Sequence, residues 1–457
     1  MSPPPDVIVI GAGFAGLSAA AALAERGARV LVLEARAQPG GRATAFTDRV
    51  TGELVDNGQH VLFGCYRETF DFLRRVNAID NVRFQPSLRL TYIDALGRAS
   101  VLQCPPLPSP MHLLGAVLDW DPMPWADRLS VLRLAGPLLR ARRELHRTGR
   151  VTVTPPATVS EWLASLGQGR KLTTWLWEPL AVAALNQDPR AASAAPFVRV
   201  LAEMFGPDEG AAAIVLPTRP LHLMYAEPAR AYIEARGGDV RLNALARVIV
   251  ESERVEAVEV RGERIPARSV ISSVPWFGLR QLFGAAPPPS LSATVEAATA
   301  MESMPIVTVN LWYDRPVLDQ AFVGLPGRKM QWVFDKRIAF SERASHLSLV
   351  SSGATALTAM TNEDLTTLAA EEVRDALPAA RDARLVRATA VRERQATFSL
   401  AHGQPARPGT ETGVAGLWLA GDWIDTGLPS TIESAVVSGH RAARCVLARL
   451  QPRAIAG

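Results

Sequence analysis

Three glycines near the start of the chain occupy positions where a backbone could hold a phosphate. They are Gly11, Gly13 and Gly16, and Glu34 follows at the end of the next apolar segment, 18 residues after Gly16. In this spacing the first glycine allows a tight turn, the second lets a pyrophosphate approach, and the third lets a helix pack closely on a strand. A carboxylate at the position of Glu34 can accept hydrogen bonds from a ribose diol. The pattern predicts a dinucleotide site, with an ordinary glycine-containing turn as the alternative.

A second pair of glycines, Gly40 and Gly41, lies just beyond Glu34 and precedes Arg42. Two glycines let the backbone pass close to a ligand, and the guanidinium of Arg42 can reach phosphate oxygens. In isolation this tripeptide could be an ordinary turn. Its short distance from Glu34 favours a second contribution to the same nucleotide site.

A third motif, Gly421-Asp422, ends a short apolar run near the end of the chain. Its aspartate could contact a ribityl or pyrophosphate group. Ser430 and Glu433 have the spacing of a capping box, which predicts a helix that begins directly after Ser430. N–H groups of its first turn, including that of Ile432, could face a flavin C2=O and stabilise the negative charge of a reduced flavin. The alternative is a surface helix with a surface cap.

Apolar segments around these motifs predict an α/β fold. Strands are expected at 6–10, 29–33, 269–274, 306–313, 330–334, 346–351 and 416–420, a hairpin at 247–260, and helices at 17–26, 126–147, 363–377 and 431–450, with further helices within 155–205. The segment Val7–Ala24 is uncharged, but three glycines interrupt it and no basic region precedes it. We therefore expect a strand, a turn and a helix there rather than a membrane span or a signal peptide.

The motifs divide the chain into a discontinuous nucleotide-binding domain and inserted material. We expect a Rossmann-like domain from residues 1–85, 230–290 and 412–457, and a mixed α+β substrate domain from residues 86–229 and 291–411. A length of 457 residues, with 48% hydrophobic and 21% charged residues, suits such a large buried interior and excludes disorder.

Charge and cysteine content narrow the class of protein further. A net charge of +4 with scattered basic residues gives no nucleic-acid footprint. Cys65, Cys104 and Cys445 are far apart and form no C-x-x-C pair, which argues against a zinc site and a disulfide framework. We therefore expect no metal and a reducing, cytoplasmic location.

Together the three motifs resemble the flavin-containing amine oxidase and phytoene desaturase superfamily, most strongly over 6–75 and 412–445. A closer resemblance, to the squalene-associated FAD-dependent desaturases or hydroxysqualene dehydroxylases of bacterial hopanoid biosynthesis, rests on Asp56–Tyr66 (DNGQHVLFGCY), Arg394–Phe398 (RQATF) and Gly421–Pro429 (GDWIDTGLP). The resemblance implies a Rossmann-like FAD-binding domain of the amine-oxidase type, with FAD as the cofactor.

The resemblance also implies which residues hold FAD. These are Gly11, Gly13, Phe14, Ala15 and Gly16 at the pyrophosphate; Glu34 and the adjoining Ala35 at the ribose; Gly41, Arg42, Gly58, Gln59 and His60 near the phosphates and isoalloxazine; Val248 at the adenine through its backbone; and Gly421, Asp422 and Ile432 at the ribityl chain and ring. Ser434 stands where the superfamily usually has glycine, which leaves the helix packing there open.

The resemblance implies reduction of the allylic C–OH of hydroxysqualene to C–H by reduced FAD, whose own reductant stays unidentified. Hydroxide is a poor leaving group, so an acid must protonate it. His60 and Asp425 are the candidate acids or water-orienting groups, because both lie in motifs that the resemblance places beside the ring. Structural roles are the alternatives for both residues.

A C30 isoprenoid substrate needs a long apolar tunnel and is drawn from a membrane. Candidate lining residues are Trp120, Trp125, Trp162, Trp175, Trp177, Trp312 and Trp332, although each could equally be a core residue. Within residues 107–147, the segment Leu129–Arg143 could be an interfacial amphipathic helix with a basic end, or a solvated helix interrupted by Pro137. We expect peripheral contact with the inner face of the cytoplasmic membrane.

Three competing functions remain open. A carotenoid-type desaturase or isomerase would act on a similar polyene, with the desaturase moving hydride in the opposite direction. An amine oxidase is disfavoured because no aromatic cage can be inferred. A prenyl-lipid carrier of the GDP-dissociation-inhibitor type would bind lipid without flavin, but the intact Gly-Gly-Arg and Gly-Asp motifs favour a redox role.

Overall fold

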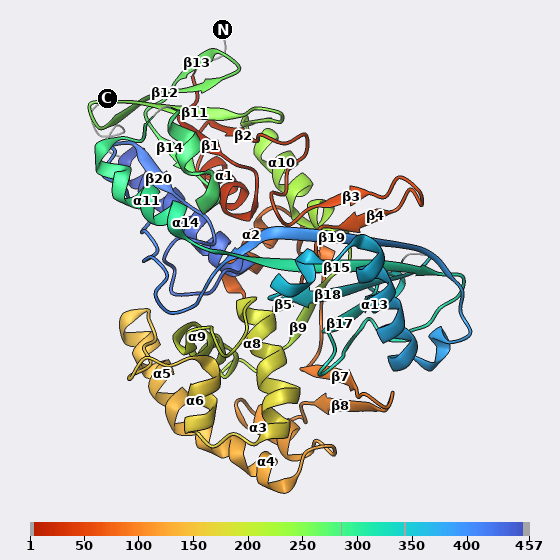
Figure 1. The fold of residues 1–457 in the computed structure, drawn as a ribbon. Coiled ribbons are helices and arrows are strands. Elements are labelled where there is room, and N and C mark those ends of the chain that lie inside the picture. The colour runs from red at the N-terminus through yellow and green to blue at the C-terminus, as the bar shows by residue number, and fades with distance from the viewer. Residues whose placement is uncertain (1–3, 285, 342–343, 451–457) are drawn as a thin grey trace.

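The computed structural model describes residues 4–284, 286–341 and 344–450, so the predicted terminal segments extend beyond the described residues at both ends. A parallel sheet lies toward one end of the molecule (Figure 1). Its strands run in the order β10 (Asp239–Arg241), β2 (Val30–Leu33), β1 (Val7–Ile10), β14 (Val270–Ser272) and β20 (Leu417–Leu419). β1, β2, β14 and β20 are buried throughout, which is why they are continuous apolar runs rather than alternating ones.

Two helices from opposite ends of the chain pack together beside this sheet. They are α1 (Phe14–Glu25) and α14 (Ile432–Leu450). A Cβ atom on Gly439 of α14 would lie 2.3 Å from the carbonyl oxygen of Ala15, so glycine is required for the helices to approach this closely. The uncharged stretch Val7–Ala24 is thus β1, a glycine turn and most of α1, as the sequence predicts. Among the described residues, no helix combines the length and apolarity needed to cross a bilayer.

A small antiparallel sheet follows at the same end of the molecule. It consists of β11 (Ala246–Glu251), β12 (Arg254–Val260) and β13 (Glu263–Pro266). The first two strands are the predicted hairpin, and their register shifts by one residue between Ile249 and Val250.

A second large sheet is mixed and has seven strands. Its order is β19 (Leu385–Phe398), β15 (Ser303–Tyr313), β18 (Ser345–Ser352), β17 (Trp332–Asp335), β16 (Phe322–Gly324), β7 (Arg89–Ile93) and β8 (Ala99–Gln103). Residues far apart in the sequence meet here, because β7 pairs with β16 in parallel. Val307, Val309 and Leu311 of β15 pack against α13 (Asn362–Ala376) on one face. The alternate residues of β15 therefore point to the other face, where Ile306 lines a cavity.

Short strands and helices connect the two large sheets. They are β3 (Ala45–Thr47), β4 (Leu54–Asp56), β5 (Leu62–Phe63), α2 (Arg67–Arg75), β6 (Val82–Phe84), β9 (Ile214–Pro217), α10 (Glu227–Glu234), α11 (Ser292–Ala300) and α12 (Lys336–Phe340). β9 pairs with both β5 and β6, so residues 214–217 join the early part of the chain.

A group of helices, here called the helical lobe, lies at the far end from β11–β13 (Figure 1). Its members are α3 (Met111–Leu118), α4 (Trp125–Ser130), α5 (Ala135–Thr148), α6 (Val159–Ser165), α7 (Arg170–Leu172), α8 (Glu178–Leu185) and α9 (Ala194–Met204). The single helix predicted at 126–147 is instead two α-helices joined by a 3₁₀ turn at Val131–Leu134. A π-helical turn at Thr173–Trp177 connects α7 to α8 directly before Pro179. Proline lacks the backbone N–H that a regular helix uses for hydrogen bonding, and a π-helical turn accommodates it.

Candidate cofactor and substrate site

A cavity of about 700 Å³ lies between the parallel sheet and the seven-stranded sheet. One end is bordered by the glycine turn after β1 and by the start of α14, and the other by apolar side chains of β7, α8 and β17. Its size is within the range of small-molecule and cofactor pockets. The cavity therefore joins the predicted nucleotide motifs to an apolar region.

The glycine motifs form one cradle. A Cβ atom on Gly41 would lie 3.3 Å from the Cα atom of Gly13, so the two backbones cross almost in contact. Gly11 has a φ of +105°, which glycine adopts readily. A Cβ atom on Gly16 would lie 2.0 Å from the carbonyl oxygen of Gly11, which is the close helix–strand packing that the sequence predicts. Gly16 itself is not among the residues that line the cavity, whereas Gly11, Gly13, Phe14 and Ala15 are.

Glu34 is placed by backbone N–H groups. Its Oε2 accepts a hydrogen bond from the N–H of Ala12 at 2.7 Å, and its Oε1 accepts one from the N–H of Arg36 at 2.9 Å. Both Glu34 and Ala35 line the cavity. The carboxylate is thus held at the edge of the glycine cradle, where it can accept further hydrogen bonds from a ribose diol.

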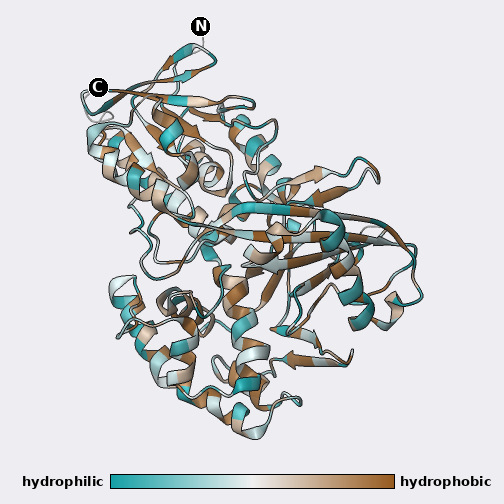
Figure 2. Ribbon diagram, in the orientation of Figure 1, coloured by the Kyte–Doolittle hydropathy of each residue, from teal (hydrophilic) through white to brown (hydrophobic). Residues whose placement is uncertain are grey.

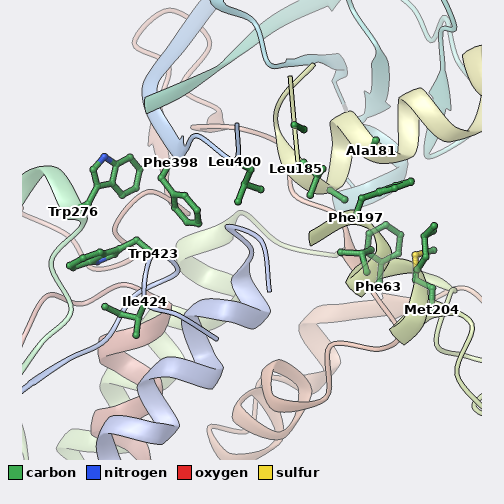
Figure 3. Packing of buried hydrophobic residues seen from close by; sticks show 14 of the residues in the cluster. Phe63, Ala181, Leu185, Phe197, Met204, Trp276, Phe398, Leu400, Trp423 and Ile424 are labelled. Atoms are coloured by element: carbon green, nitrogen blue, oxygen red, sulfur yellow. The ribbon is translucent and has the colours of Figure 1, made fainter. Parts of the chain in front are cut away.

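The Gly-Gly-Arg and Gly-Asp motifs meet through an ion pair. Nη2 of Arg42 lies 2.5 Å from Oδ1 of Asp422, and Nη1 of Arg42 donates to the carbonyl oxygen of Ala396 at 2.8 Å. The hydroxyl of Ser430 donates to the other carboxylate oxygen of Asp422. The ring centroid of Trp276 lies 5.2 Å from the guanidinium carbon of Arg42. Figure 3 shows this indole beside Phe398 and Trp423. Two motifs 380 residues apart therefore form one polar wall of the cavity.

The start of α14 completes this wall, but the predicted capping box is absent. Thr431 and Ile432 line the cavity, and the hydroxyl of Thr431 accepts from the N–H of Ser434 at 3.1 Å. Glu433 points away and accepts hydrogen bonds from the N–H groups of Glu68 and Thr69, at 3.0 and 2.9 Å. The capping prediction was wrong because the partner of Glu433 is the N-terminus of α2, which lies far away in the sequence.

His60 lies in the cavity wall with Asn57, Gly58 and Gln59. Its Nδ1 is 2.7 Å from the carbonyl oxygen of Gly58, so Nδ1 carries the proton that this bond requires. Burial lowers the pKa of His60, partly offset by the Gly58 bond and by Asp56 and reinforced by the nearby cations. Nε2 has no hydrogen-bond partner among the described residues. Neutral His60 therefore presents an acceptor.

Asp425 is placed elsewhere. Its carboxylate pairs with Arg150 at 2.6 Å and with Arg407 at 3.4 Å. It lines a separate surface hollow with Arg441 and Arg444, and it is not among the described residues that line the cavity. The structure thus places Asp425 outside the cavity that contains the glycine motifs, with its side chain held by two arginines.

The structure also describes the surroundings of Val248 and Ser434. Val248 is buried within β11 and is not among the described lining residues, whereas Ala246, two residues earlier on the same strand, is one of them. Ser434, which replaces a usual glycine, is fully buried, and its hydroxyl bonds to the hydroxyl of Thr426 at 2.7 Å and to the carbonyl oxygen of Asp422 at 3.1 Å. The serine therefore fits and adds a contact to the Gly-Asp loop.

The apolar part of the cavity differs from the tryptophan-lined tunnel expected. It is lined by Leu88, Leu90, Tyr92, Leu176, Leu180, Phe322, Trp332, Phe334 and Val350, among others. Of the tryptophans proposed, Trp332 is present in this lining. Trp120, Trp162 and Trp177 belong to the buried core instead, and Trp125 is two-thirds exposed. Composition alone could not separate these roles.

Two contributors had no signal in the sequence. Tyr225 stacks on Phe14 with ring centroids 3.5 Å apart, and its hydroxyl donates to the carbonyl oxygen of Gly40 at 2.7 Å, so it holds both glycine turns. Lys336 is buried behind Gln59. Because these contacts join distant parts of the chain, local spacing could not reveal them. Within the described part of the chain, no cluster of His, Cys, Asp and Glu is arranged to hold a metal ion.

Known proteins match this chain over most of its length. The family described as flavin containing amine oxidoreductase matches residues 14–447. The hydroxysqualene dehydroxylase of Rhodopseudomonas palustris is 31% identical over 449 residues, covering 97% of this chain and 98% of that protein. A probable zeta-carotene desaturase of Synechococcus elongatus is 25% identical over 480 residues, covering 96% and 98%.

The fold agrees with solved structures of this group. Cyclohexylamine oxidase from Brevibacterium oxydans superposes with a TM-score of 0.71 at 17% identity, covering 98% of this chain and 100% of that one. The glycine cradle, the placed carboxylate of Glu34 and the Arg42–Asp422 wall fit the nucleotide and ribityl parts of the cofactor. The cofactor is FAD, and the chain belongs to the flavin-containing amine oxidoreductase family.

Proposed function

We propose that this FAD-dependent oxidoreductase reduces the allylic alcohol of hydroxysqualene to squalene. The observation that carries the proposal is the continuity of one cavity, whose polar end is lined by the residues we expect to bind FAD and whose other end is lined by apolar side chains. The relatives named hydroxysqualene dehydroxylase, which match nearly the whole chain, support the choice of substrate. A C30 hydrocarbon chain requires a long apolar surface and few polar groups, as this region offers.

The reaction breaks the allylic C–O bond, forms a C–H bond and releases water. Bound reduced FAD supplies the hydride, and a proton must reach the leaving oxygen. Neutral His60 can accept a hydrogen bond from the substrate hydroxyl at Nε2 and so orient the C–O bond. When protonated, the same nitrogen can donate, which would assist departure of water. The apolar side chains around Trp332 and Phe334 exclude bulk water from the carbon that accepts hydride.

Anaerobic single turnover tests this proposal. Protein with photoreduced FAD is mixed with hydroxysqualene, and flavin absorbance and extracted lipids are followed together. We expect reoxidation of the flavin at the rate at which squalene forms, one for one. Reduced protein that keeps its flavin reduced in the presence of hydroxysqualene, while an artificial acceptor reoxidises it, would contradict the assignment.

A polyene desaturase is the second candidate, because relatives named carotene and phytoene desaturases match almost as much of the chain. That reaction would transfer hydride to oxidised FAD. Bleaching of oxidised protein by a carotene precursor, without any reaction of reduced protein with hydroxysqualene, would favour it. A flavin-free prenyl-lipid carrier is disfavoured, because it would have no use for the Arg42–Asp422 wall.

We also propose that the protein takes its substrate from an anionic membrane surface through the helical lobe. Six large apolar side chains are exposed between residues 107 and 139: Leu107, Met111, Trp125, Leu129, Leu132 and Leu139. Exposed arginines accompany them on the same segment, at positions 133, 140, 143 and 147. Apolar side chains with flanking arginines suit the interface of an anionic bilayer. Figure 2 marks the mixed hydropathy of these helices.

The lobe also adjoins the apolar end of the cavity. Trp120, which precedes α4, packs against Tyr92 with ring centroids 5.4 Å apart, and Tyr92 lines the cavity. A lipid substrate that enters beside α4 would therefore meet the cavity wall at Tyr92. This contact supports the proposal by placing the lobe against the cavity wall.

A further inference from the structure

A buried ion pair lies directly behind the cavity wall that carries His60. Nζ of Lys336 is 2.5 Å from Oδ2 of Asp56 and 2.7 Å from Oε1 of Gln59. The side chains of Lys336 and Asp56 are each only 1% exposed. Buried charges are costly unless they are paired and hydrogen-bonded, and removing one partner leaves an uncompensated charge in the interior.

The pair ties three separate elements to the cavity wall. Lys336 is the first residue of α12, and its ammonium also lies 3.7 Å from the ring centre of Phe340 on that helix. Asp56 ends β4, and its other carboxylate oxygen accepts a hydrogen bond from the N–H of Leu221 at 3.0 Å. Gln59 belongs to the segment 57–60 that lines the cavity. Lys336 therefore binds the chain on both sides of Gly58, at Asp56 and at Gln59.

Gly58 is the residue that orients His60. Its carbonyl oxygen lies between the two residues bound by Lys336 and accepts the Nδ1 proton of His60 at 2.7 Å. If the segment shifted, this carbonyl would move, and the imidazole ring would lose the bond that turns Nε2 toward the cavity.

We propose that Lys336 is a positioning residue that holds the segment 57–60 so that neutral His60 presents Nε2 to the substrate hydroxyl. The role assigned to the hydroxyl rests on the proposed function, whereas the hold on the segment does not. No contact between Lys336 and substrate is needed, because Gln59 and Gly58 transmit the placement.

The role of Lys336 can be measured through the pKa of His60, because several charged groups act on this residue. Burial lowers the pKa of His60, the Gly58 carbonyl and Asp56 raise it, and Lys336 and Arg42 lower it. Glu393 of β19 also faces this wall, where it accepts a hydrogen bond from Asn57 at 2.8 Å. Removing the charge of Lys336 should therefore raise the pKa of His60, because a nearby cation that lowers it is lost.

Two readouts on FAD-loaded protein test the proposal without substrate. Hydrogen–deuterium exchange reports on the segment 57–60. The pH dependence of His60 acylation by diethyl pyrocarbonate, followed by mass spectrometry, reports the fraction of unprotonated imidazole. In the wild type we expect an acylation midpoint below about 6.5, the ordinary value for histidine.

In Lys336→Met we expect exchange of the segment to rise about tenfold and the acylation midpoint to move up by about one pH unit. Arg337→Gln is the matched control, because Arg337 is the next residue of α12 and pairs with Asp335 at 3.2 Å, away from the cavity. It should change neither readout. If Lys336→Met does not retain FAD, Asp56→Asn/Lys336→Met removes both buried charges, and faster exchange of the segment is expected there too.

Wild-type exchange and midpoint in a folded Lys336 variant would overturn the proposal, as would equal changes in Arg337→Gln. Because neither readout needs turnover, inactivity toward hydroxysqualene would count against the proposed function alone.

Discussion

Gly16 touches the carbonyl oxygen of Gly11 so closely that even one methyl group has no space. In Gly16→Ala the added carbon would lie 2.0 Å from that oxygen, and the first turn of α1 would have to shift. Overpacking of this kind costs about 1–3 kcal/mol, and the phosphate-facing N–H groups would move with the helix. We expect at least a tenfold loss of FAD affinity, roughly the loss that about 1.4 kcal/mol produces. Titration of apoprotein with FAD measures it.

Gly409→Ala is the control for that substitution, because a Cβ atom there would meet no other atom within 4 Å and Gly409 has no positive φ. It should bind FAD as the wild type does. Equal FAD affinity in the Gly16 variant would show that the turn can adapt.

Single-turnover kinetics should distinguish the role of His60 from that of Asp425. His60→Leu removes the Nε2 acceptor and should slow reduction of hydroxysqualene at least about tenfold with FAD still bound. Asp425→Asn should leave that rate unchanged and reduce the free energy of unfolding by about 1–2 kcal/mol, because it weakens the pairs with Arg150 and Arg407. A slow Asp425 variant of normal stability would restore Asp425 as a catalytic candidate.

For single residues, the sequence predicts a place in the site when the partners of the residue lie nearby in the chain or when only glycine fits the position. Gly11, Gly13 and Glu34 are of this kind, and the structure brings them together at the cavity. Asp425 could not be placed, because its neighbours in the motif suggested the flavin while its actual partners, Arg150 and Arg407, come from other segments. Lys336 had no local pattern at all.

At the scale of elements, Glu433 joins the first turn of α14 to the N-terminus of α2. The carboxyl accepts hydrogen bonds from Glu68 and Thr69, yet burial raises its pKa to about 7. Because the folded pKa lies above the unfolded value of about 4.3, the folded state binds the extra proton between these values. Stability contributed by this group is therefore present at low pH and is lost as pH rises through about 7.

We expect Glu433→Gln to remove this dependence. Relative to the wild type, the variant should gain up to about 3 kcal/mol in free energy of unfolding between pH 5 and pH 8, as 1.36 kcal/mol per pKa unit implies. Urea unfolding at several pH values measures the difference. A difference between the two proteins that stays constant with pH would mean that Glu433 is ionised throughout.

The predicted start of α14 was correct to one residue, whereas the predicted cap was not. Ser430 and Glu433 have the spacing of a capping box, but Ser430 binds Asp422 and Glu433 binds α2. The spacing of a capping box considers only hydrogen bonds within one helix end. Where a helix end faces a cofactor site, tertiary partners compete for the same side chains. The divided helix at 126–147 has a local origin, since Pro137 lies in the first turn of α5, where the N–H that proline lacks would have no partner within the helix.

At the scale of the whole molecule, the helical lobe lies at the far end from the parallel sheet (Figure 1). We expect the protein to co-sediment with vesicles of phosphatidylglycerol and phosphatidylcholine. The variant Trp125→Ser/Leu129→Ser/Leu132→Ser should bind at least about tenfold more weakly, because it removes three exposed apolar side chains. Added salt should weaken binding of the wild type as well.

The matched control for this variant is Leu385→Ser/Val386→Ser, which removes exposed apolar side chains from β19 instead. It should bind vesicles as the wild type does. Equal loss in both variants, or binding that ignores lipid charge and salt, would contradict a specific docking surface on the lobe.

The α/β class and the return of the chain to the parallel sheet could be predicted, since β1, β2, β14 and β20 are continuous apolar runs. The order of the seven-stranded sheet could not, because β7 pairs with β16 across more than two hundred intervening residues. The proposed domain boundaries stay a prediction. Likewise, the apolar lining had to be observed, since a buried leucine and a cavity leucine look the same in a sequence.

The ion pair between Arg42 and Asp422 has a consequence for biosynthesis. Arg42 leaves the ribosome early, whereas Asp422 and the start of α14 emerge only when nearly the whole chain has been made. The growing polypeptide can form β1, β2 and the glycine turn first, yet it cannot enclose FAD from both sides. Stable capture of the coenzyme should therefore be a post-translational event, and cells short of riboflavin should accumulate finished chains that await it.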